Sequence, residues 1–445
     1  MTINYQYGGF SEKQIVIEAT KDISLKQKNA LETISPFSLE NLAPLSFDTL
    51  DVGFDSASAS ASASASASAE ESIDWVIHSP KLDISQVEER KSDKRTLAVA
   101  PVMPVDIIEP LKYEFEGALD EDVDLGSLTK DSVSLGVELV GATISNFSGD
   151  GAVIAILDTG IDRTHPAFQG INFLCKNFTT DDGGDPNNVT DYRGHGTHCA
   201  GTIFGRNHRK YGRIGVAPGV KRVLVAKVIG ENGGDSEVIV NAVYWASENG
   251  ANIISMSLGV DYPGQVQALM QSLPPKIAAA RALEGYRASV IMFDRLAGLM
   301  RQKNVLIIGA AGNDSRRQEN PDYEVGVRPP SVAEGIVSVA AMGIADENQK
   351  YNVAPFSNVG ANIAGPGVEV ISAKVGGGYR RLSGTSMAAP HVAGVAALWI
   401  EKLNKENGGY NYTTLVSNLI GRADSTVFVP GLNLKKVGSG LVKAP

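Results

Sequence analysis

Residues 152–158 read Ala152-Val153-Ile154-Ala155-Ile156-Leu157-Asp158, an apolar run that ends on a carboxylate. An uninterrupted apolar run of this length is typical of a strand buried on both faces of a parallel sheet. Asp158 would then stand at the carboxyl end of the strand, the edge at which open α/β sheets place their functional sites. The run therefore predicts an α/β fold with Asp158 at its site.

Two further segments place polar side chains next to regular structure. Apolar residues recur at helical spacing across residues 387–400, so Ser386 is expected at a helix N-terminus. Unpaired amides and the positive end of the helix dipole favour negative charge that develops on a nearby carbonyl oxygen. Asn313 follows a second apolar run, residues 305–308, and its side-chain amide is a candidate second donor to that oxygen.

His195 completes the set that turns a serine hydroxyl into a nucleophile. A neutral imidazole takes the hydroxyl proton and later returns it to the leaving group, while a carboxylate on the other ring nitrogen fixes the tautomer. Each residue alone has an ordinary alternative: Asp158 as a turn former, His195 as a structural residue, Ser386 as a helix cap. Their occurrence together, with Asn313, favours a site for nucleophilic acyl transfer.

A family resemblance rests on four contiguous motifs, which are Asp158-Thr159-Gly160-Ile161-Asp162, His195-Gly196-Thr197-His198-Cys199-Ala200-Gly201-Thr202, Ala310-Ala311-Gly312-Asn313 and Gly384-Thr385-Ser386-Met387-Ala388-Ala389-Pro390. The chain order Asp, His, Ser is that of subtilisin-like serine proteases. From about Ser134 to Ala444 the chain resembles a subtilase catalytic domain.

The resemblance implies a three-layer α/β fold with a mostly parallel central sheet. It also implies a serine endopeptidase that hydrolyses peptide bonds through an acyl-enzyme on Ser386. His195 would be the general base and then acid, and Asp158 would orient it. Asn313 and the Ser386 amide would hold the oxyanion.

The same resemblance suggests where a substrate would lie. Ser257, Leu258 and Gly259 would form one wall of the S1 pocket and pair with the substrate backbone, and Ala310, Ala311 and Gly312 would form the other wall. The base of the pocket is expected within residues 324–330. Arg328 lies in this range, and an arginine is unusual at the base of an open pocket. The preferred P1 residue stays open.

Cys199 resembles the cysteine that proteinase K-like enzymes carry after the catalytic His, where typical bacterial subtilisins have an aliphatic residue. Its ordinary interpretation is a small buried hydrophobe. Cys175 and Cys199 are the only cysteines, and we expect the chain to fold without disulfides.

No cofactor is expected, and calcium is left open. Many relatives bind calcium through a loop after the His helix, but residues 204–212 are basic and lack carboxylates. A second loop, residues 181–188, has the composition of a cation site, although Asp, Gly and Asn are also what a tight turn uses.

The composition excludes several classes of function. A formal net charge of −10 argues against nucleic acid as a partner, and 43% hydrophobic with 20% charged residues is ordinary for a globular protein. The sequence predicts no membrane span and no secretory signal at its N-terminus, so a cytoplasmic location is the default expectation, with leaderless export left open.

Residues 1–125 are expected to form an N-terminal region, and residues 126–445 the peptidase domain. Seven Ser-Ala pairs at residues 56–69 predict a flexible linker within the N-terminal region. Around it, strands are expected near residues 14–18, 75–78 and 96–100, with a helix near 25–33. By resemblance, this region is a prosegment that aids folding and covers the active site until it is cleaved. A regulatory or partner-binding module is the alternative.

We expect residues 101–109 and the acidic segment 114–124 to lead across the cleft of the peptidase domain. Residues 261–304 are longer than one crossover helix requires. Pro274-Pro275 and the helical spacing after it predict a short helix, a turn and a long amphipathic helix. These helices are either packing elements or an arm beside the S1 pocket that narrows the choice of substrate.

The expected partners are polypeptide substrates and the chain's own N-terminal segment. Two rival functions are weighed against a general serine endopeptidase. One is a maturation protease dedicated to a single peptide, and the other is a non-catalytic peptide-binding protein of the same fold. The second is disfavoured because no member of the Asp158, His195, Ser386 set is missing.

Overall fold

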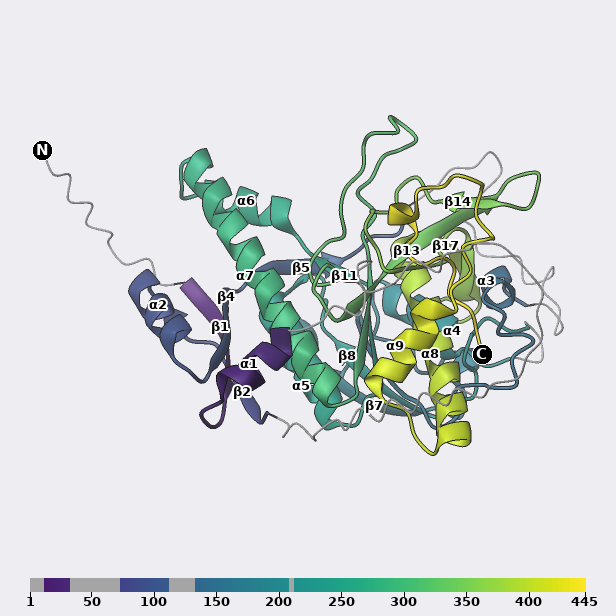
Figure 1. The fold of residues 1–445 in the computed structure, drawn as a ribbon, viewed down its shortest axis with the longest axis horizontal. Coiled ribbons are helices and arrows are strands. Elements are labelled where there is room, and N and C mark those ends of the chain that lie inside the picture. Colours follow the sequence, from purple (N-terminus) through teal and green to yellow (C-terminus); the bar gives the residue numbers. More distant parts are fainter. Residues whose placement is uncertain (1–11, 33–72, 112–132, 208–211) are drawn as a thin grey trace, which may run out of the picture.

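The computed structural model describes residues 12–32, 73–111, 133–207 and 212–445. An N-terminal antiparallel sheet lies beside a larger α/β body (Figure 1). The Ser-Ala segment 56–69, the acidic segment 114–124 and residues 208–211 of the basic loop lie outside the described residues. Within the described ranges, the helices are too short or too polar for any of them to span a membrane.

The α/β body is built on an eight-stranded sheet with β6 (Val153–Asp158) near its middle. The strand order is β14-β13-β12-β10-β6-β8-β7, with β15 beside β13. Every pairing is parallel except that between β13 and β14. The other strands are β7 (Asn172–Asn177), β8 (Arg222–Lys227), β10 (Ile253–Met256), β12 (Leu306–Ala310), β13 (Ile336–Ala345), β14 (Tyr351–Val353) and β15 (Ile363–Pro366).

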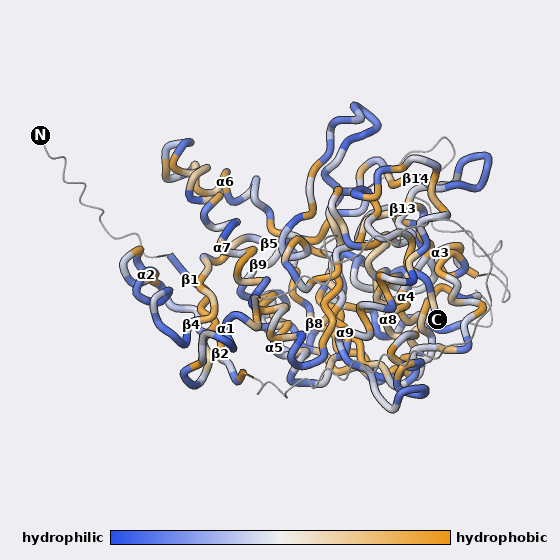
Figure 2. Tube along the Cα trace, viewed as in Figure 1, coloured by the Kyte–Doolittle hydropathy of each residue, from blue (hydrophilic) through white to orange (hydrophobic). Residues whose placement is uncertain are grey.

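Helices cover both faces of this sheet, which confirms the predicted three-layer architecture. Ile154 and Ile156 of β6 pack in one apolar cluster with α4 (His195–Phe204), α8 (Thr385–Asn407) and α9 (Tyr412–Gly421). Ala155 and Leu157 alternate with them and belong to a second cluster with α5 (Ser236–Glu248) and α7 (Pro275–Gln302). Figure 2 shows apolar residues concentrated along the central strands.

Short elements complete the body. They are α3 (Leu135–Leu139), the 3-10 turns at Pro166–Phe168, Asp181–Gly184 and Leu434–Lys436, and a hairpin of β16 (Val370–Ala373) and β17 (Tyr379–Leu382).

The N-terminal sheet contains strands at all three predicted positions. Its middle strand β1 (Glu12–Ala19) pairs with β2 (Trp75–His78) and β3 (Lys81–Leu82) on one edge and with β4 (Thr96–Pro101) on the other, always antiparallel. Helix α1 (Leu25–Glu32) matches the predicted helix. Helix α2 (Ile84–Ser92) was not predicted. It begins at a capping box in which Asp83 accepts a hydrogen bond from the backbone of Gln86.

The N-terminal sheet packs on the helix layer formed by α5 and α7. Apolar residues of β1 and β4 share one buried cluster with these helices. Trp75 of β2 meets Tyr244 of α5 edge-on, with ring centroids 4.8 Å apart. Lys13 and Glu12 of β1 form ion pairs with Glu237 and Arg281 on the two helices. The sheet and the α/β body therefore share one apolar interface.

The chain leaves this sheet through β5 (Pro104–Ile107), which crosses to the α/β body. There β5 pairs antiparallel with β11 (Leu258–Val260) on one side and with β9 (Gly234–Asp235) on the other. Residues 101–109 were expected to lead across the cleft, and this pairing places β5 beside the predicted S1 wall.

The long segment after β11 forms the predicted short helix, turn and long helix. Helix α6 (Tyr262–Met270) contacts β5 and α7, and Pro274 is the N-cap of α7. One end of α7 covers the central sheet, and its other end projects with α6 beside the N-terminal sheet (Figure 1). The packing interpretation therefore describes α7, while α6 lies next to the segment that enters the cleft.

Gly298 is the point at which α7 touches α1, and its substitution tests the docking of the N-terminal region. A Cβ at Gly298 would lie 2.9 Å from the Leu31 carbonyl oxygen and 3.2 Å from its Cα. Alanine favours the helix by about 1 kcal/mol over glycine, but this backbone contact relaxes only if α1 moves. We expect Gly298→Ala to speed amide hydrogen exchange in β1 and β4 and to leave β6 and β8 unchanged.

The matched control is Gly421→Ala at the end of α9, where a Cβ meets no atom within 4 Å. Equal exchange in the two variants would contradict this account of the interface.

Candidate active site

The four predicted catalytic residues come together at one edge of the central sheet. Asp158 is the last residue of β6, and His195 is the first residue of α4. Ser386 is the second residue of α8, and Asn313 lies in the loop after β12. The strand ends and helix starts that the sequence predicted therefore bring these side chains into one place.

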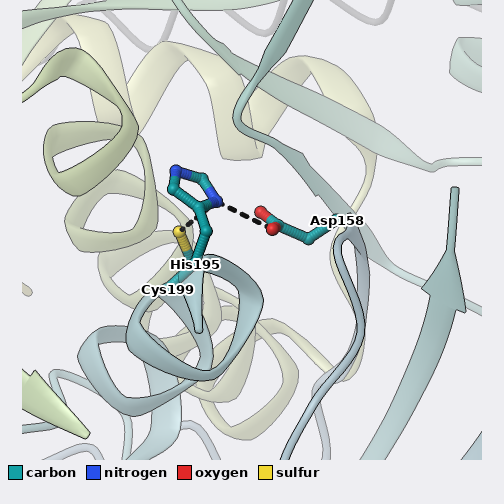
Figure 3. Close-up of side chains that lie close together, drawn as sticks. All are labelled: Asp158, His195 and Cys199. Carbon is teal, nitrogen blue, oxygen red and sulfur yellow. Dashed lines mark hydrogen bonds and ion pairs between the residues drawn. The ribbon is translucent and has the colours of Figure 1, made fainter. Parts of the chain in front are cut away.

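His195 and Asp158 form a buried pair. The imidazole Nδ1 lies 2.7 Å from Asp158 Oδ1, and both side chains are only 2% exposed (Figure 3). Burial on its own lowers the pKa of His195, but attraction to Asp158 outweighs it and raises the pKa well above its usual value. Asp158 Oδ1 also accepts the Thr159 N–H at 2.7 Å, which helps to stabilise its charge.

Close approach of α4 to β6 depends on Gly196. A Cβ at this position would lie 2.2 Å from the Gly160 carbonyl oxygen and 3.1 Å from Asp158 Oδ1. Any larger residue would therefore push the start of α4, and with it the imidazole, away from the carboxylate.

Asp191 anchors the start of α4 and was not among the predicted site residues. Its carboxylate accepts the backbone N–H groups of Gly194 at 2.7 Å and Thr197 at 2.8 Å, together with the Thr197 hydroxyl at 2.7 Å. It also accepts the hydroxyl of Thr159, the neighbour of Asp158, at 2.8 Å. An aspartate just before a helix is an N-terminal capping signal, and that pattern could have identified it.

Ser386 faces the backbone of the segment that follows β5. Its Oγ–H donates to the Ile108 carbonyl oxygen at 2.6 Å, while the Ile108 N–H donates to the Ser257 carbonyl oxygen at 3.1 Å. His195 Nε2 is buried and has no hydrogen-bond partner among the described residues. The hydroxyl proton is thus directed at the peptide carbonyl and not at the imidazole.

Asn313 is held with its amide nitrogen toward the same segment. Its Oδ1 accepts both the backbone N–H and the hydroxyl of Thr385, each at 2.9 Å. Because both Thr385 groups are donors, the amide oxygen of Asn313 must face Thr385. The amide nitrogen Nδ2 then faces that segment and donates to the Glu109 carbonyl oxygen at 2.9 Å. The side chain is therefore preset as a donor to a carbonyl oxygen next to Ser386.

Comparison with known proteins agrees with this geometry. A model of the subtilase family matches residues 149–437. The chain belongs to the subtilase family. It is a subtilisin-like serine endopeptidase, as the names of its relatives indicate.

Three relatives illustrate the likeness. An "Intracellular serine protease" of Paenibacillus polymyxa is 34% identical over 266 residues, which cover 59% of this chain and 71% of the relative. The "Major intracellular serine protease" of Bacillus subtilis (strain 168) is 34% identical, over 56% of this chain and 68% of the relative. The "M-protease" of Shouchella clausii (strain KSM-K16) is 32% identical, over 73% of this chain and 72% of the relative.

One set of the predicted substrate-binding residues of this subtilase, residues 257–259, lies directly beside β5 and Ile108. Leu258 and Gly259 pair with Ile107 and Asp106, in the β11–β5 ladder that Ser257 begins through its carbonyl oxygen. Ala310 and Ala311 are buried in the same large apolar cluster as the Ile108 side chain. Gly312 donates its N–H to the Thr385 hydroxyl at 3.1 Å, which ties these residues to the start of α8.

Arg328 lies near Gly259, in the region expected to hold the pocket base. A Cβ on Gly259 would lie 3.3 Å from the Arg328 Cδ. The guanidinium forms an ion pair with Asp314, with Arg328 Nε 2.8 Å from Oδ2. This pairing explains how an arginine is tolerated there, because its charge is already matched.

Cys199 lies one helical turn beyond His195, as predicted. Its Sγ is 3.9 Å from His195 Nδ1 and donates to the Ser386 carbonyl oxygen at 3.4 Å. Burial raises the pKa of the thiol, so it is neutral at neutral pH. Both cysteines are free. In the described part of the chain, one group of side chains has potential metal-ligand atoms within 4.8 Å of one another, namely Asp158, His195 and Cys199.

The second candidate calcium loop does not fit a divalent cation. The Asp181 carboxylate lies 3.1 Å from the ammonium of Lys227, which is buried, and it also accepts the Glu231 N–H at 3.2 Å. A buried ammonium beside the carboxylate takes the place that a hard cation would need. Asp185 and Asn188 of this loop act as turn formers, since they accept the N–H groups of Asn187 and Thr190.

The position of Cys199 predicts inhibition by soft metals. A mercurial bound to Cys199 Sγ would push the imidazole of His195 out of place, and a misplacement of about 1 Å can cost on the order of 10²-fold in rate. We therefore expect a small mercury compound to suppress peptidase activity while iodoacetamide reacts slowly, because the thiol is buried and neutral.

The comparison is with Cys199→Val, which should keep its activity and lose its sensitivity to mercury. If that variant is still inhibited, the responsible thiol is the half-buried Cys175 and the assignment is wrong.

Proposed function

We propose that Ser386 is the nucleophile of this endopeptidase, with His195 as its general base and then acid. Asp158 fixes the Nδ1–H tautomer and stabilises the imidazolium, and Asn313 Nδ2 stabilises the oxyanion. The supporting observation is a buried His195–Asp158 pair at the same edge of the sheet as Ser386, whose hydroxyl contacts a peptide carbonyl oxygen. The substrates are polypeptides that bind as an extended strand against residues 257–260.

The bound segment, residues 104–109, acts as an intramolecular inhibitor. It comprises β5 and the two residues that follow it. It occupies the edge of β11 that an extended substrate would use, and its Ile108 carbonyl oxygen meets the nucleophile. Residues 1–125 are in this account a prosegment-like region, and residues 126–445 are the peptidase domain. The buried interface with α5 and α7 supports this assignment, because it holds the segment at the cleft.

The bound segment resists cleavage because of its register. Attack requires the Ser386 proton to pass to His195 Nε2 and the Ile108 carbonyl oxygen to enter the reach of Asn313 Nδ2. Instead the Ser386 hydroxyl donates to the Ile108 oxygen, and Asn313 donates to the next carbonyl, that of Glu109. A shift of the segment would be needed before the Ile108–Glu109 bond could react.

The nucleophile assignment is tested with a serine-directed phosphonate. We expect the reagent to label Ser386 and to abolish proteolysis, because only a hydroxyl activated by a base reacts at a useful rate. Ser386→Ala should fold normally, give no labelling and show no peptidase activity. Labelling of another serine, or full activity of Ser386→Ala, would exclude this assignment.

The same variant tests self-processing. Mass spectrometry of the wild-type protein should show an N-terminal fragment that ends between Ala100 and Ser134, and Ser386→Ala should remain intact. A fully active enzyme of 445 residues would favour the regulatory-module alternative.

The raised pKa of His195 predicts how activity depends on pH. His195 must be neutral to act as a base, so kcat/KM should rise with pH through a pKa above the ordinary value of 6.5. Asp158→Asn removes the attraction that raises this pKa and leaves the burial that lowers it. We expect its acid limb to move to lower pH, with kcat reduced by about 10⁴-fold because the tautomer is no longer held.

The measurement is the pH profile of kcat/KM for one peptide substrate in both proteins. An acid limb that stays at the same pH in Asp158→Asn would show that the Asp158 carboxylate does not set the pKa of the base.

A further inference from the structure

Two acidic side chains of the bound segment meet a single arginine. Asp106 of β5 accepts a hydrogen bond from Nη1 of Arg193, with 2.7 Å between Nη1 and Oδ1. Glu109 accepts from Nη2 of the same guanidinium. The two carboxylates flank Ile107 and Ile108, so one fork holds the segment on both sides of the carbonyl that faces Ser386.

Arg193 is built into the active-site scaffold. Its backbone N–H donates to Asp191 at 3.2 Å, the carboxylate that also anchors the first turn of α4. Its side chain is 24% exposed, whereas those of Asp106 and Glu109 are 46% and 65% exposed. The backbone of Arg193 thus belongs to the active-site scaffold, and the acidic side chains belong to the bound segment.

We propose that Arg193 is a specificity-determining residue that selects acidic peptides. It recognises one carboxylate two residues before, and a second carboxylate one residue after, the residue whose carbonyl meets Ser386. This inference rests on the proposed function, since it uses the bound segment as a guide to how substrates lie. The substrate class is therefore a polypeptide with two acidic residues at the spacing of Asp106 and Glu109.

The chemistry of the guanidinium supports this class. Its planar fork presents several N–H donors in fixed directions, so it can hold two carboxylates at once and offset their mutual repulsion. An ion pair this close to solvent contributes modestly, so each carboxylate is expected to change kcat/KM by up to roughly fivefold. The preference should also weaken as ionic strength rises.

The first experiment measures kcat/KM of the processed enzyme on quenched fluorescent peptides with the sequence of residues 103–111. Four peptides carry the natural residues, Asp106→Asn, Glu109→Gln or both changes. For the wild type we expect each amide to lower kcat/KM, and for Arg193→Ala we expect four nearly equal values. Arg193→Glu should prefer peptides with lysine at both positions. The matched control is Arg222→Ala, a change at an exposed arginine, which should give the same four relative kcat/KM values as the wild type.

Equal kcat/KM of the wild type for all four peptides would overturn the inference about Arg193. Phosphonate labelling of Ser386 gives the fraction of active enzyme in each variant, so a poorly folded variant is recognised. If the wild type shows neither phosphonate labelling of Ser386 nor cleavage of any peptide, the proposed function is refuted instead. Failure of the Arg193 inference can therefore be told apart from failure of the proposed function.

A second experiment does not depend on catalysis. In the full-length Ser386→Ala protein, amide hydrogen exchange of residues 105–107 reports how firmly the segment is held. We expect faster exchange when Arg193→Ala, Asp106→Asn or Glu109→Gln is added, and no change with Arg222→Ala. Unchanged exchange in all of these variants would also overturn the inference.

Discussion

The active site depends on one contact, in which the end of β6 and the start of α4 bring Asp158 against His195. Removing two ionisable groups from water costs free energy, and the cost is offset only when the geometry is good and the remaining polar atoms are satisfied. Here Asp158 gains the Thr159 N–H as a second partner, and Gly196 lets the backbones approach. The remaining unpaired atom, His195 Nε2, is the one that the chemistry needs free.

The Asp191 carboxylate links several parts of this arrangement. Through Thr159 it acts next to Asp158, and through Gly194 and Thr197 it fixes the first turn of α4. Its bond to the Arg193 N–H ties the backbone of that residue to the same carboxylate. The backbones around His195, the proposed base, and Arg193, the proposed specificity residue, are therefore held by the same carboxylate.

Local sequence patterns and the family resemblance together predicted the fold, and they named residues that the structure brings to one edge of the sheet. The apolar run before Asp158 predicted β6 because a strand buried on both faces needs nothing but apolar residues. Helix α2 was missed because none of its residues is buried, so it has no apolar stripe, although its Asp83–Gln86 capping box was visible. Asp191 and Arg193 were missed for another reason. The side-chain partners of Arg193 are brought to it by folding, and no spacing in the sequence encodes those contacts. Asp191 has nearby partners in Gly194 and Thr197, but its contact with Thr159 also depends on the fold.

The register of the bound segment is likewise a property of the whole fold. Residues 101–109 were expected to cross the cleft, but the carbonyl that meets Ser386 is decided by the pairing of β5 with β11. The N-terminal sheet leads into β5, and its apolar residues pack with α5 and α7 in one buried cluster. Tethering replaces a bimolecular association by an intramolecular one, so the segment remains in the cleft without strong local contacts. A free peptide has no such tether. Modest contacts such as those with Arg193 then carry a larger share of its binding, and for that reason they can discriminate among substrates.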